Sequence, residues 1–125
     1  MKQNIIAYIK TKPTYPDPPF NPSSAYPEYS GPLSRKKNFV YDAFRNLLIN
    51  LKLDAKNINK AEWNPFREFI KPGDKVVIKP NLVTHNNYGS GPLEAVITHG
   101  SIIRPILDYV LIALKGKGLI RIADS

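Results

Sequence analysis

The sequence predicts an α/β fold, and three observations indicate it. Short runs rich in Val, Ile and Tyr occur at residues 4–10, 75–79 and 119–123. Apolar residues at helical spacing lie between them, at 39–53 and again from about residue 98 to 114. Strands that alternate with helices pair in parallel through right-handed crossovers. We therefore expect a partial Rossmann-like three-layer unit, β-α-β-α-β, with a short parallel sheet and a proline-rich N-terminal arm.

Composition limits the size and class of the protein. The chain has 125 residues, of which 42% are hydrophobic and 22% charged, as expected for one soluble globular domain. We expect residues 1–125 to be an N-terminal fragment of a larger domain, because the last predicted strand is followed only by Asp124 and Ser125. The absence of cysteine excludes disulfides, a thiolate nucleophile and an iron–sulfur cluster within this chain.

The N-terminal segment and the distribution of charge indicate the cellular location and the kind of partner. The apolar start, residues 1–12, is too short for a signal peptide and lacks a cleavage site, and no run is long enough to span a membrane. We therefore expect a cytoplasmic protein. The net charge is +8, but the one basic cluster is residues 35–37, and the aromatic residues lie mostly elsewhere. Nucleic-acid binders concentrate charge and stacking aromatics on one face, so we do not expect nucleic acid as a partner.

Residues 11–38 differ from the rest of the chain. They hold seven prolines, interleaved with Tyr15, Phe20, Tyr26 and Tyr29. Proline lacks a backbone donor and fits neither a helix interior nor an inner strand, and a flexible linker would be rich in Gly and Ser. We interpret this segment as an extended arm laid over the protein surface. The PxxP sequence at residues 16–19 leaves open a recognition motif that docks a partner chain.

Two helices are predicted after the arm. Asn38 is a suitable N-cap for a helix over residues 39–53, whose apolar face is formed by Val40, Phe44, Leu47, Leu48 and Leu51. A shorter helix is predicted from Asn64 and Pro65 to a turn at 71–73, where Gly73 supplies a positive φ. Trp63, just before this helix, is interpreted as a core aromatic.

Residues 71–125 read as a βαβ unit. Strand 75–79 ends before Pro80 and is followed by a polar loop over 81–92. A long helix begins between Thr98 and Ile102, and Pro105 near its start favours Ser101 as N-cap, with Thr98 as the alternative. Basic residues and glycine at 115–118 end the helix, and strand 119–123 follows.

Polar residues gather where ligands bind in open α/β sheets, just outside the carboxyl ends of the strands. A helix N-terminus at the same edge favours an anion such as a phosphate or a carboxylate. No Walker or GxGxxG spacing specifies a nucleotide. Each residue also has a structural reading, as a solvated lysine, a turn asparagine or a capping group. The candidate ligand-binding residues are Lys79, Asn81, Thr98 and Ser101, and the candidate catalytic residues are His99 and Asp124.

A metal site is a weaker alternative. It would combine His85, His99 and Asp124, but their spacing matches no standard zinc or iron pattern. No serine lies in GxSxG, and no closely spaced acid pair indicates glycoside hydrolysis. Cofactor and metal therefore stay unassigned, and whether the protein is an enzyme stays open.

Three strings resemble a known family. They are KPGDKVVIKPNLV at residues 71–83, VITHGSIIR at 96–104 and IRIADS at 120–125, and they look like the opening segment of the proteins catalogued as domain of unknown function 362. The arm sequence YPDPPFNPSSAYPEY at residues 15–29 resembles a long-armed subgroup. The resemblance implies an α/β fold, a longer protein and, from ferredoxin-like cysteine clusters in some relatives, redox or metal-associated chemistry. By motif position it points to Lys79, Asn81, Thr98, His99 and Asp124, although Gly100 stands where relatives have proline.

These observations lead to one functional hypothesis and two alternatives. The leading hypothesis is the N-terminal part of an anion- or metal-binding enzyme whose site lies at the carboxyl ends of the strands. The first alternative is a non-catalytic module that docks a partner through the aromatic arm. The second is a truncated, inactive fragment. In each case we expect a partner chain or further C-terminal sequence to complete the sheet.

Overall fold

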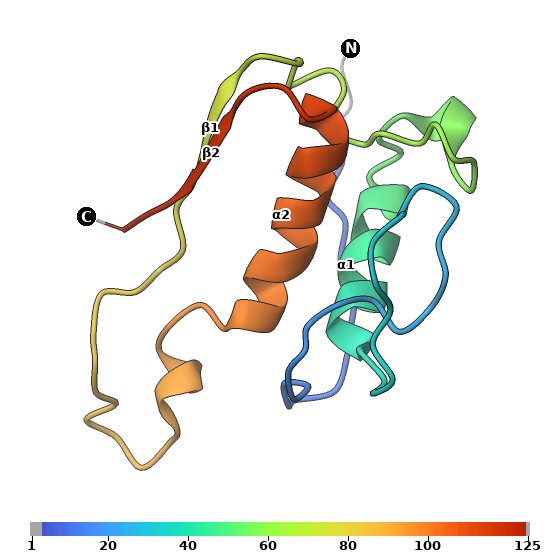
Figure 1. The fold of residues 1–125 in the computed structure, drawn as a ribbon. Helices are drawn as coiled ribbons and strands as arrows, with labels where there is room; N and C mark the ends of the chain where they lie inside the picture. The colour runs from blue at the N-terminus through green and yellow to red at the C-terminus, as the bar shows by residue number, and fades with distance from the viewer. Residues whose placement is uncertain (1–3, 125) are drawn as a thin grey trace.

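The computed structural model describes residues 4–124 and shows two helices beside a small parallel sheet (Figure 1). The main elements are α1 (Phe39–Asn50), β1 (Lys75–Ile78), α2 (Gly100–Leu114) and β2 (Leu119–Ile122). Single 3₁₀ turns occur at Ala55–Asn57 and Leu93–Ala95. β1 and β2 pair in parallel, with Lys75 opposite Leu119 and Ile78 opposite Ile122. The predicted α/β class with parallel strands is confirmed.

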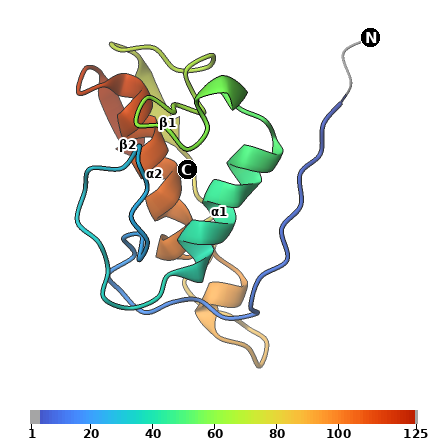
Figure 2. The same cartoon turned by 90° about the vertical axis from the view of Figure 1, so that its right-hand side faces the viewer.

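The predicted first strand at residues 4–10 is wrong. Within residues 4–124 the sheet contains β1 and β2 and no third strand. Residues 4–10 are extended but make no backbone hydrogen bond with another described residue. In both views they run beside α1, apart from the sheet (Figures 1 and 2). A β-rich segment becomes a strand only where a neighbouring strand offers its backbone groups, so the described chain forms no Rossmann-like unit.

α1 begins as predicted and ends earlier. Asn38 is the N-cap, and its Oδ1 accepts a hydrogen bond from the Tyr41 N–H at 3.0 Å. The helix ends at Asn50 rather than at residue 53, because Lys52 adopts a left-handed conformation with φ of 56°. The Lys52 backbone N–H then donates to the Ile49 carbonyl, three residues back, at 2.8 Å. This tightened end is typical of helix C-termini.

The shorter helix predicted from residue 65 is a series of turns instead. The N–H groups of Arg67 and Phe69 bond three residues back, and only the Ile70 N–H reaches four residues back, to the Phe66 carbonyl. The segment between Pro65 and Pro72 is too short for cooperative helix propagation. The turn that follows is as predicted, with Gly73 at φ of 101°.

α2 starts one residue after His99, which is its N-cap. The Ser101 N–H donates to His99 Nδ1 at 3.2 Å. The prediction of Ser101 as N-cap, with Thr98 as the alternative, is therefore wrong. Ser101 lies inside the helix, and the capping hydrogen bond is accepted by the His99 imidazole rather than by a hydroxyl. One face of α2 covers the sheet, where Val110 and Leu114 pack against Ile78.

The C-terminal half of the arm is part of the protein interior. Glu28 has a fully buried side chain and accepts hydrogen bonds from Arg45 Nε at 2.7 Å and from Arg45 Nη2 at 3.2 Å. The Tyr109 hydroxyl donates to the same carboxylate at 2.9 Å. Trp63 is also fully buried, and the centre of its ring lies 4.9 Å from the guanidinium carbon of Arg45. The ring packs against Tyr109, as expected for a core aromatic. The arm was expected to lie over the protein surface, but the burial of Glu28 makes its C-terminal half part of the interior.

Burial changes the acidity of the tyrosines around this network. Burial raises the pKa of Tyr41, and the nearby Asp108 carboxylate, which accepts a hydrogen bond from the Tyr41 hydroxyl at 3.0 Å, raises it further. Burial and the Glu28 carboxylate do the same for Tyr109. Two arm tyrosines have raised pKa values as well, again first through burial: Tyr26 and Tyr29.

Candidate functional site

Parallel pairing brings Lys79 and Asp124 to the same end of the sheet. Pairing continues past the strands, because the Ala123 N–H donates to the Ile78 carbonyl at 3.1 Å. The Lys79 ammonium forms an ion pair with Asp124, whose other oxygen accepts the Leu82 N–H at 2.7 Å. The Asp124 side chain is 11% exposed and that of Lys79 is 59% exposed. The Asp124 carboxylate is thus held by two contacts, while the Lys79 side chain stays largely exposed to solvent.

Asn81 and Thr98 lie next to each other through backbone contacts. The Asn81 N–H donates to Thr98 Oγ1 at 2.8 Å, and the Thr98 N–H donates to the Asn81 carbonyl at 2.8 Å. This exchange fastens the loop after β1 to the segment before α2. Both contacts use the main chain of Asn81, which is exposed, so its side-chain amide stays accessible to a ligand.

His99 and Ser101 have their contacts with the arm and with each other. The His99 ring stacks on Tyr15 with centroids 4.2 Å apart and planes 11° apart, and it meets the Phe20 ring edge-on at 5.2 Å. Ser101 is fully buried, with its Oγ 2.9 Å from His99 Nδ1. Ser101 therefore positions the imidazole. The structure joins Lys79 to Asp124, while His99 belongs to a neighbouring aromatic cluster.

The described residues contain neither a metal cluster nor a membrane span. No group of three or more His, Asp or Glu side chains in residues 4–124 could hold a metal ion. The metal site considered for His85, His99 and Asp124 is thus not formed, because His85 lies exposed in the loop after β1. Among the same residues, no helix is long and apolar enough to cross a bilayer.

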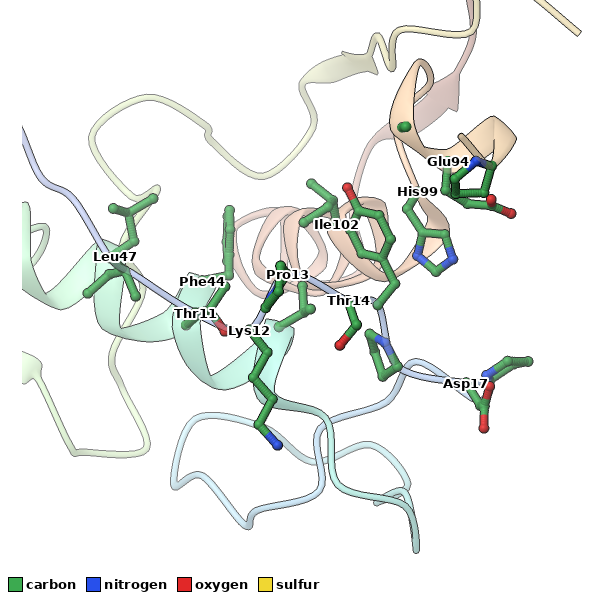
Figure 3. Close-up of a pocket in the computed structure, with 18 residues that line it drawn as sticks. Thr11, Lys12, Pro13, Thr14, Asp17, Phe44, Leu47, Glu94, His99 and Ile102 are labelled. Carbon is green, nitrogen blue, oxygen red and sulfur yellow. The ribbon is translucent and has the colours of Figure 1, made fainter. Parts of the chain in front are cut away.

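A groove under the arm was not anticipated from the sequence. It has a volume of about 1120 Å³ and lies between residues 9–18 of the arm, one face of α1 and the segment 92–102 (Figure 3). We call it the arm groove. Its floor is apolar and includes Phe44 and Leu47 of α1 and Ile102 of α2. His99 and Glu94 lie at one end. Only the tertiary placement of the arm creates this space, so no local sequence pattern could indicate it.

The fold and these residues define a small α/β protein with a polar cluster at the carboxyl ends of two parallel strands. The sequence matches no family model, and no curated protein or solved structure is significantly similar to it.

Proposed function

We propose that this chain is the N-terminal part of a cytoplasmic α/β enzyme, of the domain of unknown function 362 type, that binds a small anion at the carboxyl ends of β1 and β2. The observation that supports this proposal most is the exposed Lys79 ammonium held over a fixed carboxylate, beside the exposed amide of Asn81. An ammonium has three donors, so Lys79 can keep its contact with Asp124 and still donate to a ligand.

The proposed catalytic roles follow from the same geometry. Asp124 accepts hydrogen bonds from the Leu82 N–H and from the Lys79 ammonium, and these contacts orient the carboxylate as a candidate proton acceptor. His99 stands at the start of α2 with one ring nitrogen engaged by Ser101. Thr98 directly precedes His99 in the chain, and its hydroxyl accepts the Asn81 N–H, which links the loop after β1 to the start of α2. In this proposal Lys79 and Asn81 bind the anion and Asp124 accepts a proton, whereas His99 lies in the neighbouring aromatic cluster and takes no part in this site.

The test is a titration of the ¹⁵N-labelled protein with inorganic phosphate at constant ionic strength, followed by the amide shifts of residues 79–82. We expect Lys79→Ala to weaken binding about tenfold, the equivalent of about 1.4 kcal/mol for a charged hydrogen bond. Lys75→Ala is the matched control, because Lys75 is an exposed lysine at the start of β1, the strand that Lys79 directly follows, and its loss changes the net charge equally. Equal effects of the two substitutions would mean that phosphate senses only the overall charge, and would overturn the proposal.

A further inference from the structure

We propose that the arm groove is a second binding site, separate from the strand ends, and that it takes an elongated, uncharged, apolar molecule with a hydrogen-bond acceptor at one end. The groove volume of about 1120 Å³ is slightly above the usual range of roughly 300–1,000 Å³ for small-molecule sites. Three features favour this ligand class: the apolar floor, the free ring nitrogen of His99 and the charges at the rim.

The floor is built by part of the apolar face of α1. Val40, Phe44 and Leu47 recur at helical spacing and line the groove, with Ala43 between them. Phe44 and Leu47 are half-buried, so each still presents apolar surface to the groove. Burying such surface contributes roughly 25 cal/mol for each Å² removed from water. An apolar chain or ring system laid along this face would therefore be stabilised.

His99 supplies a directed donor at one end of the groove. A backbone N–H can only donate, so the contact from the Ser101 N–H makes His99 Nδ1 an acceptor. The neutral imidazole then carries its proton on Nε2. Tyr15 and Phe20 hold the ring in place. No hydrogen bond engages Nε2 within residues 4–124, and His99 lines the groove (Figure 3). A ligand acceptor such as a carbonyl or hydroxyl oxygen fits this donor.

The charges at the rim disfavour an anionic ligand. Glu94 lies beside His99 on the same wall (Figure 3). Two further charged residues line the groove: Asp17 is paired with Lys36, and the Lys12 ammonium lies 5.6 Å from the centre of the Phe39 ring. A carboxylate at the His99 end would therefore be repelled by the Glu94 carboxylate, whereas a neutral oxygen would not be. This preference distinguishes the arm groove from the anion site proposed at the strand ends.

The test uses Nile red, an uncharged dye with a carbonyl acceptor whose fluorescence rises in apolar surroundings. We expect saturable binding, displaced at least threefold more effectively by decanol than by decanoate, which has the same chain length. Ala43→Trp should abolish dye binding by filling the floor of the groove. Val77→Ser, which removes a 63% exposed apolar side chain from the sheet, should leave it unchanged.

His99→Phe tests the donor, since it keeps an aromatic ring beside Tyr15 and removes Nε2–H. We expect decanol to displace the dye about three- to tenfold less well from this variant, as for the loss of one neutral hydrogen bond. Circular dichroism of each variant must match that of the parent. Dye binding that survives Ala43→Trp, or decanoate displacing as well as decanol, would overturn the proposal. So would sedimentation as a dimer without dye binding, because a second copy would then occupy the groove.

Discussion

Replacement of Glu28 by alanine should strongly destabilise the protein. Glu28 is in the arm, 17 residues before its partner Arg45, yet the two side chains form a buried, doubly hydrogen-bonded ion pair. The Tyr109 hydroxyl depends on the same carboxylate. Truncation leaves a guanidinium whose side chain is 8% exposed without its counterion, and a phenol without its acceptor.

The size of the effect follows from these contacts. Removing one partner of a buried ion pair costs about 3–5 kcal/mol, most of it the penalty for an unpaired buried charge. A domain of this size is stable by roughly 5–15 kcal/mol, so a large share of the free energy of unfolding depends on one arm residue. With a urea m-value of about 1.5 kcal/mol/M, the unfolding midpoint should fall by about 2–3 M.

Urea unfolding followed by fluorescence measures this change directly, because the single tryptophan, Trp63, lies against Arg45. Asp17→Ala is the matched control in the same arm. Asp17 pairs with Lys36, but the two side chains are 77% and 62% exposed, so its loss should cost less than about 0.5 kcal/mol. A loss below about 1 kcal/mol for Glu28→Ala would refute the view that the arm is held by a buried charge pair.

Two further outcomes follow from the packing. Gly100→Ala should lower the urea midpoint by the equivalent of about 1 kcal/mol, because the new Cβ would lie 2.9 Å from Cε2 of Phe20 and the ring must move; a gain in stability would contradict this contact. Burial raises the pKa values of Tyr26, Tyr29, Tyr41 and Tyr109 in the folded protein above that of unfolded tyrosine, about 10. Their contribution to the free energy of unfolding is therefore complete below about pH 10 and is lost as the pH rises above it. A urea midpoint that stays constant from pH 8 to pH 11 would contradict that expectation.

The sequence predicted the elements whose pattern is local. The apolar stripes of α1 and α2, the cap at Asn38 and the two runs that form β1 and β2 are each contained in a few residues. The approach of Lys79 to Asp124 also follows from the sequence, because both residues come just after strands that pair in parallel. Parallel pairing with equal register then places them at one edge.

The features that were missed depend on distant contacts. Residues 4–10 have the composition of a strand, but the described chain brings no strand edge to them. Glu28 and Arg45 are charged residues that a sequence assigns to the surface, and no spacing rule indicates that the arm will bury them together. The arm groove has the same origin, since its walls come from three separate segments.

The Glu28 network also bears on the order in which the chain folds. Tyr109 and Glu28 are 81 positions apart, and Tyr41 and Asp108 are 67 apart, so each contact closes a long loop at an entropic cost. α1 and α2 can form from local contacts, whereas the network needs both helices docked and the arm in place. We expect contacts that close such long loops to form after the transition state, in which case they stabilise the protein mainly by slowing unfolding. We therefore expect the docked arm to lower the unfolding rate of the protein.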